Sequence, residues 1–173
     1  MFRFLIYKCH VKIILMNQSV LRKNINGEVI EGLKSDTKAL SSFLQNQNDG
    51  NIVYLLEKLG RLEGGYNKKP LQDLLKNPNE DIRSLAIKNL AKIGDISLLD
   101  VFLELAKQDE STDVRREAVS AIGRLRNKKT IPFLIKLLSD KDPKVVMQAI
   151  RGLLVFSDDV GVKKELKKII HHP

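Results

Sequence analysis

The sequence repeats itself at an interval of 31 to 32 residues, and this feature constrains the fold more than any other. Alanine recurs at Ala86, Ala118 and Ala149, and Leu55 occupies the same column one interval earlier. A second apolar column precedes the alanines at the same interval, and its members are Leu44, Leu75, Ala106, Leu138 and Ile170. One short structural unit is therefore predicted to recur along the chain.

Each interval predicts two helices of roughly 10–15 residues joined by a polar turn. The first helix carries apolar residues at helical spacing, as at Leu71, Leu74 and Leu75. The turns read KNPNED, KQDESTD and SDKDPK. The second helix has one apolar stripe, at the alanine and at positions −4, +1, +4 and +7 from it. In one interval this stripe is Val114, Ala118, Val119, Ile122 and Leu125.

A helix pair of this size cannot bury its apolar face alone, so neighbouring pairs must stack. We expect an all-α chain, folded as a right-handed α-solenoid of about four and a half helix-pair repeats, with no sheet and no deep central pocket. The predicted repeats cover residues 37–66, 67–96, 97–128 and 129–160, followed by a half repeat at 161–173.

The chain outside the repeats is short. Residues 1–15, MFRFLIYKCHVKIIL, are too few and too charged to span a bilayer. We expect them to come from an upstream start codon and to belong to no domain, with Met16 opening a separate N-terminal segment at 16–36. The alternative is a short strand or helix that caps the fold. At the other end the sequence stops at an inter-helix turn, so the last helix docks by itself or the chain is a fragment of a longer product.

The stretches PLQDLLKNPNEDIRSLAIKNLAKIGD and IPFLIKLLSDKDPKVVMQAIRGL resemble HEAT repeats, of the short bacterial type first described in phycobilisome lyases. The resemblance covers about residues 37–173 and implies an armadillo-like protein-binding scaffold. It also implies that the arginine at Arg83 and Arg115 joins neighbouring repeats by hydrogen bonds. Val146 takes its place in the fourth repeat, where a looser junction is expected.

The sequence contains no cluster of the residue types that catalysis or metal binding requires. Cys9 is the only cysteine, and the three histidines lie at residue 10 and in the last three positions. No phosphate-loop, dinucleotide-binding or nucleophile-elbow motif occurs. The acidic residues fall at turns and helix starts, where they cap helices. We therefore expect no catalytic residues, no cofactor, no metal site, no membrane partner and no small-molecule substrate.

Basic side chains recur on the side of the second helices opposite the apolar stripe, at positions −2, +2 and +6. Only one of these twelve positions is acidic, at Glu57, and the last repeat places Met147 and Val155 there. We predict a concave basic stripe made of Arg61, Lys88, Lys92, Arg116, Arg124 and Arg151. The formal net charge is +9, and a solvated lysine-rich surface is the alternative interpretation.

Three classes of function compete. The first is a non-catalytic cytoplasmic scaffold whose concave face binds a protein, with DNA or an acidic molecule as other partners for the stripe. The second is a detached N-terminal module of a DNA modification methyltransferase, contacting DNA or the catalytic domain. It follows from a resemblance of NINGEVIEGLKSDTKALSSFL and the repeats to the helical extension of such enzymes, although their catalytic motifs are missing. The third is a bilin lyase-like subunit or a DNA-alkylation glycosylase.

Overall fold

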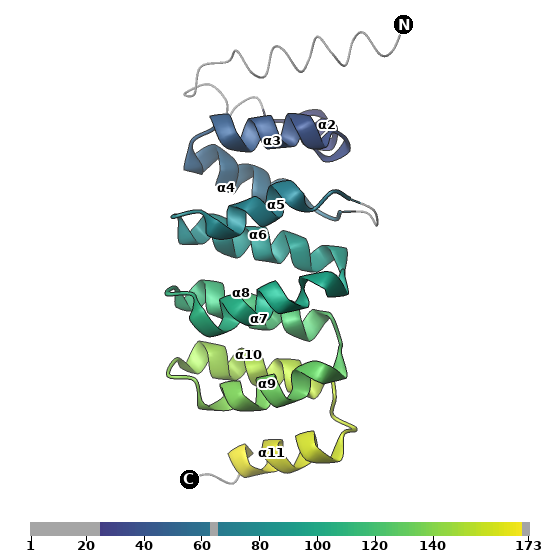
Figure 1. Cartoon of the computed structure of the whole chain (residues 1–173), viewed down its shortest axis with the longest axis vertical. Helices are drawn as coiled ribbons and strands as arrows, with labels where there is room; N and C mark the ends of the chain where they lie inside the picture. Colours follow the sequence, from purple (N-terminus) through teal and green to yellow (C-terminus); the bar gives the residue numbers. More distant parts are fainter. Residues whose placement is uncertain (1–24, 63–65, 171–173) are drawn as a thin grey trace, which may run out of the picture. The chain divides into compact units, whose positions relative to one another are not determined.

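The computed structural model describes residues 25–62 and 66–170 of the chain. Every regular element in these two ranges is helical, with ten α-helices, α2 to α11, and four 3-10 helices, η2 to η5 (Figure 1). The all-α prediction is confirmed for this part of the chain, which folds as stacked helices of the α-solenoid type. The predicted leader, residues 1–15, lies outside the described residues, as does the beginning of the segment that follows it.

The helices separate into two compact units, which divide after Asn89, within α6. The N-terminal unit contains α2 (Gly27–Ser35), α3 (Thr37–Asn46), α4 (Asp49–Lys58), α5 (Lys69–Asp73), η2 (Leu74–Lys76) and most of α6 (Glu80–Ile93). The C-terminal unit continues with η3 (Ile96–Leu98), α7 (Leu99–Gln108), α8 (Thr112–Arg124), η4 (Lys128–Thr130), α9 (Ile131–Lys136), η5 (Leu137–Ser139), α10 (Pro143–Leu154) and α11 (Val160–Ile170). The repeat boundaries and the handedness of the solenoid stay predictions.

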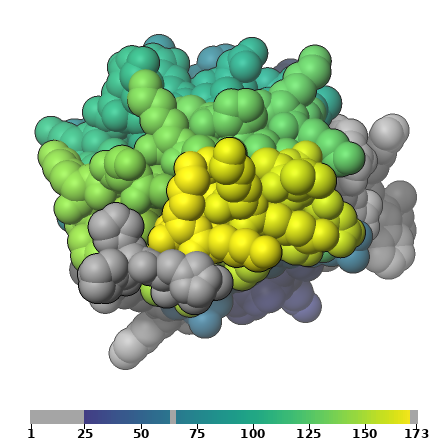
Figure 2. Space-filling model, turned by 90° about the horizontal axis from the view of Figure 1, so that it is seen from below, coloured from purple at the N-terminus to yellow at the C-terminus, as the bar shows by residue number. Residues whose placement is uncertain are grey.

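In the C-terminal unit the helices form two successive pairs, α7 with α8 and α9 with α10, and α11 follows (Figure 1). Helix α11 contacts both α9 and α10 and forms the outer surface at this end of the unit (Figure 2). It docks through the fully buried Val162, whereas Val160 on its other side is 82% exposed.

The first helices of two pairs are shorter than the predicted 10–15 residues. Helix α5 has five residues and α9 has six, and each continues into a 3-10 turn, η2 or η5. The tighter turn keeps the carbonyls at its end paired, because Asn77 N–H donates to Leu74 O and Asp140 N–H donates to Leu137 O, each at 3.1 Å. Helical spacing alone does not reveal this change, since both helix types bury leucines three residues apart.

The predicted apolar stripe forms the core of the second helices. Ala86, Ala118 and Ala149 are fully buried, as are their stripe neighbours at −4 and +1 in the first two of these helices. The +7 residues, Ile93 and Leu125, are only half-buried, because they lie at or beyond the last turn of α6 and α8. Burial of the small alanine column is what lets each second helix pack closely on its surroundings.

Helices α8 and α10 approach each other closely at two glycines. A Cβ atom built on Gly123 would lie 3.2 Å from the Cα atom of Gly152. A Cβ atom on Gly152 would in turn lie 3.3 Å from both terminal methyl groups of Leu134 in α9. The absence of side chains at these two positions therefore sets the separation of α8 and α10.

The N-terminal unit holds its second helices together differently. The fully buried Asn89 of α6 donates its side-chain amide to Leu56 O in α4 at 2.8 Å. Leu56 is near the end of α4, where helix carbonyls lack partners within their own helix. A hydrogen bond thus links α4 to α6 in this unit, whereas a contact between two glycines links α8 to α10 in the C-terminal unit.

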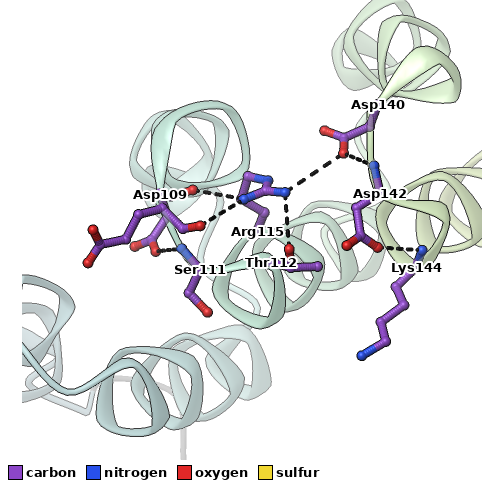
Figure 3. A network of polar contacts seen from close by, with 8 residues as sticks. Asp109, Ser111, Thr112, Arg115, Asp140, Asp142 and Lys144 are labelled. Carbon is purple, nitrogen blue, oxygen red and sulfur yellow. Dashed lines mark hydrogen bonds and ion pairs between the residues drawn. The ribbon is translucent and has the colours of Figure 1, made fainter.

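A buried arginine closes the turn between α7 and α8 (Figure 3). Arg115 is 5% exposed, and its Nη1 donates to the carbonyls of Asp109 and Glu110 at 3.1 and 3.2 Å. Its Nη2 donates to Thr112 Oγ1 at 3.3 Å. Arg83 makes the same bonds to the carbonyls of Asn77 and Pro78, at 2.9 and 3.0 Å.

The hydrogen bonds of Arg115 therefore lie inside its own helix pair, which corrects the expectation that they join neighbouring repeats. Its link to the next pair is an ion pair, with 3.9 Å between Nη2 and Asp140 Oδ1 (Figure 3). Val146 stands where the fourth pair would have its arginine. The turn before α10 keeps a bond that the turn before α8 also has: Asp140 Oδ1 accepts from Asp142 N at 2.9 Å, as Asp109 Oδ1 accepts from Ser111 N at 2.9 Å.

Asp142 caps the start of α10, as expected of an acidic residue at a turn. Its Oδ1 accepts a hydrogen bond from Lys144 N at 2.8 Å. This bond is the main cause that lowers the pKa of Asp142 below its ordinary value, and the Thr112 hydroxyl and the charges of Lys144 and Arg115 act in the same direction. The folded state thus favours the ionised carboxylate.

The glycine contact predicts opposite effects for two alanine substitutions. Gly123→Ala should destabilise the protein by about 1–3 kcal/mol, because the new methyl group meets backbone rather than a flexible side chain. Gly32→Ala is the control in α2, where nothing lies within 4 Å, and it should stabilise by about 0.5–1 kcal/mol. Thermal unfolding measures both, and an equal rise in melting temperature would show that α8 and α10 do not meet at these glycines.

The lowered pKa of Asp142 predicts an acid-dependent loss of stability. The carboxylate stabilises the fold above its unfolded-state pKa, and this contribution is lost as the pH falls through the lower folded-state pKa. Asp142→Asn keeps an oxygen that can cap the helix, so its melting temperature should fall less than that of wild type between about pH 6 and about pH 3. Asp158→Asn, at an exposed site outside this network, should follow the wild-type curve.

Candidate functional site

The six residues of the predicted basic stripe divide between the two units. Arg61 and Lys88 belong to the N-terminal unit, and the other four belong to the C-terminal unit. Arg61, Lys88, Arg124 and Arg151 are exposed, whereas Lys92 and Arg116 are half-buried. None of the six is fully buried, so each side chain reaches the surface.

Arg61 does not occupy the helical position from which it was predicted. Helix α4 ends at Lys58, and Gly60 has a φ of +67°, a left-handed conformation that turns the chain away from the helix axis. The spacing of 100° per residue therefore no longer applies at Arg61. Helix geometry thus gives no reason to align Arg61 with the other basic residues of the predicted stripe.

Both half-buried residues of the predicted stripe, Arg116 and Lys92, already interact with other groups of the protein. Arg116 Nε lies 3.3 Å from Asp113 Oδ1, one turn earlier on α8. With side-chain exposures of 37% and 58%, this pair contributes at most about 1 kcal/mol, but it offsets the positive charge at that point. Lys92 at the end of α6 also has an interaction partner.

Arg124 and Arg151 are brought together by the contact between α8 and α10. Arg124 directly follows Gly123, and Arg151 directly precedes Gly152. Because the Gly123 Cβ position lies 3.2 Å from Gly152 Cα, the two arginine Cα atoms are no more than about 12 Å apart. Within the described residues neither guanidinium forms a hydrogen bond or an ion pair. Two unpaired cations therefore extend from neighbouring points of the backbone.

Apolar side chains surround Arg151 on the exposed side of α10. Met147 is 52% exposed, Leu154 is 54% exposed and Val155 is 43% exposed. Met147 and Val155 lie four residues on either side of Arg151, and Leu154 lies three residues after it, so all share one helix face. The opposite face is the buried one, at Val145, Ala149 and Leu153.

The sequence prediction included Met147 and Val155 only as members of the stripe that lack charge, and it missed Leu154. The signal that identifies them is the appearance of large apolar residues on both faces of α10. A helix that packs on one side only needs a single apolar stripe. Packing within the described residues therefore does not account for the second set.

Among the residues that the structure describes, the hydroxyl of Tyr66 and Oε1 of Glu117 are buried oxygens without a hydrogen-bond partner. Burial raises the pKa of Tyr66 to about 12, so the phenol stays protonated at neutral pH. Across residues 25–62 and 66–170 no three potential metal ligands cluster together. In the same ranges no helix is both long and apolar enough to cross a membrane.

The comparison with known protein families agrees with this architecture. No functionally curated protein matches the sequence. A family model of HEAT repeats matches residues 99–173, which contain α7 to α11 and so include the α8–α10 contact. Residues 99–173 of the chain are therefore similar to HEAT repeats.

Proposed function

We propose that the chain is a non-catalytic scaffold that binds a protein partner through the exposed face of its second helices. HEAT repeats build helical scaffolds, and stacked repeats present the same helix position again and again along one surface. The observation that carries the proposal is the exposed group of Arg124, Arg151 and the apolar residues of α10. A group of unpaired cations and exposed apolar side chains is typical of a binding surface rather than of a surface that contacts only water.

The exposed apolar residues favour a protein over DNA as the partner. Phosphate contacts require cations, which Arg124 and Arg151 supply, but a phosphate backbone gains nothing from Met147 or Leu154. A protein partner uses both kinds of side chain, because its apolar residues are removed from water and its carboxylates pair with the arginines. Binding to DNA is thus the main competing outcome of the experiment below.

The proposal of a scaffold without catalysis is supported by the nature of the exposed groups. Guanidinium groups stay protonated at neutral pH and do not serve as general bases, and thioether and aliphatic side chains do not donate or accept protons. The residues on this face can attract, orient and desolvate a partner. They do not include the nucleophile and base that a reaction needs.

Charge reversal on the second-helix face should remove partner binding. In Lys92→Glu/Arg124→Glu/Arg151→Glu the fold should persist, because none of the three side chains is fully buried. The affinity for a captured protein partner should fall at least about tenfold, equivalent to about 1.4 kcal/mol. The measurement is quantitative capture from cell extract, followed by binding of the purified partner at low and high salt.

The control is Lys128→Glu/Lys129→Glu/Lys136→Glu, three exposed lysines of η4 and α9 that lie outside the second helices. This variant has the same net charge as the test variant. Equal loss of binding in both would show that only the bulk charge matters, and tighter binding of the wild type to duplex DNA than to any protein would replace the scaffold by a DNA-binding module.

The purified 173-residue chain is expected to have no methyltransferase activity on DNA. Incubation with radiolabelled S-adenosylmethionine and duplex DNA should transfer no label above the level of a heat-denatured sample. Transfer that requires the folded chain would contradict the non-catalytic proposal.

A further inference from the structure

We propose that the exposed face of α10, together with the end of α8, binds an acidic amphipathic helix. We call this the α8–α10 surface, and it consists of Arg124, Met147, Arg151, Leu154 and Val155. The inference rests on the proposed scaffold function and adds the chemistry of the partner to it.

The apolar residues define one side of the partner. Met147, Leu154 and Val155 are each about half exposed although they lie in or next to a well-formed helix. From Met147 to Val155 they extend over two helical turns, about 12 Å along the axis. A partner must present apolar side chains over the same length to remove them from water. A helix with apolar residues at i, i+3 or i+4, and i+7 does so with one face.

The arginines define the flanks of that helix. Arg151 lies between Met147 and Val155 in the sequence of α10, and Arg124 extends from the adjacent end of α8. Neither guanidinium has an ion-pair partner among residues 25–62 and 66–170, so two positive charges lie close together without a paired carboxylate in that part of the chain. Carboxylates placed beside the apolar stripe of the partner would pair with them, and guanidinium groups form two parallel hydrogen bonds with a carboxylate. Lys144, exposed one turn before Met147 on α10, adds to the same field.

The close contact between Gly123 and Gly152 gives this surface a fixed geometry. Because no side chain separates α8 from α10 at that point, the Cα atoms of the two arginines cannot move apart without moving a whole helix. Fixed backbone positions limit the separations that the two guanidinium groups sample, which reduces the cost of ordering them on binding. The α8–α10 surface therefore selects a partner whose carboxylates have a matching spacing.

The test is selection from a displayed library of 20-residue helices. All members carry apolar residues at i, i+3, i+4 and i+7 on one face, and the flanking positions are randomised among acidic, basic and neutral residues. The full 173-residue chain is the bait. We expect the selected helices to be enriched in Asp and Glu at the flanks. Enrichment in basic or neutral flanks, or none relative to the unselected library, would overturn the proposal.

Three double variants then locate the binding of the selected helix, measured by fluorescence anisotropy. Met147→Ser/Leu154→Ser and Arg124→Glu/Arg151→Glu should each weaken it at least tenfold, and added salt should weaken wild-type binding while leaving the arginine variant little changed. Ile96→Ser/Val160→Ser changes two exposed apolar residues outside the surface and should bind like wild type. Circular dichroism checks that each variant keeps its helix content and melting temperature.

The outcomes separate this inference from the proposed function. If the charge-reversed triple variant loses the captured cellular partner while Met147→Ser/Leu154→Ser retains both that partner and the selected helix, the scaffold function stands and the α8–α10 surface is wrong. If the triple variant also retains the cellular partner, the scaffold function through this face fails as well. Equal binding of a 20-base-pair duplex by wild type and by Met147→Ser/Leu154→Ser, with loss in Arg124→Glu/Arg151→Glu, would assign the arginines to phosphates.

Discussion

The close packing of second helices on one another is the interaction on which the C-terminal unit depends. It is made at residues without a side chain, Gly123 against Gly152, and the small Ala118 and Ala149 are fully buried in the same two helices. Small residues allow backbones to approach until carbon atoms on both helices are in contact, and each such contact adds dispersion energy. The adjacency of Arg124 and Arg151 is a direct result of this approach, since each is bonded to one of the contacting glycines.

The helical periodicity of the sequence was sufficient to predict which residues form the core. The alanine column is buried, and so are the residues at −4 and +1 in α6 and α8, because a helical period of 3.6 residues places them on one side of the helix. The lengths of α5 and α9 were not predictable in this way. The change to a 3-10 turn depends on which N–H groups bond to the last carbonyls of each helix. The role expected of Arg115 was right only in part, since its hydrogen bonds lie within its own helix pair and an ion pair with Asp140 makes the link to the next pair. The sequence does not show which of several carbonyls within reach a side chain bonds.

The candidate surface was predictable only in part. Repetition identified Arg124 and Arg151 as members of one column set, and both are exposed. Two other members differ from expectation because of local details, the ion pair of Arg116 with Asp113 and the end of α4 before Arg61. The apolar half of the surface was missed because Met147 and Val155 were considered only as uncharged positions in a row of basic residues. Function in a repeat protein can lie where one copy departs from the rest.

The arginine that closes the turn of its own helix pair has a consequence for how such a chain could lengthen or shorten during evolution. Arg115 satisfies the carbonyls of Asp109 and Glu110 from within one interval of the sequence, and Arg83 does the same for Asn77 and Pro78. A duplicated interval thus brings the closure of its own turn with it. Gene duplication could add such a unit, or unequal recombination remove one, without leaving a turn unclosed. The interval with Val146 has no such arginine, and Arg115 of the preceding interval reaches its turn through the ion pair with Asp140.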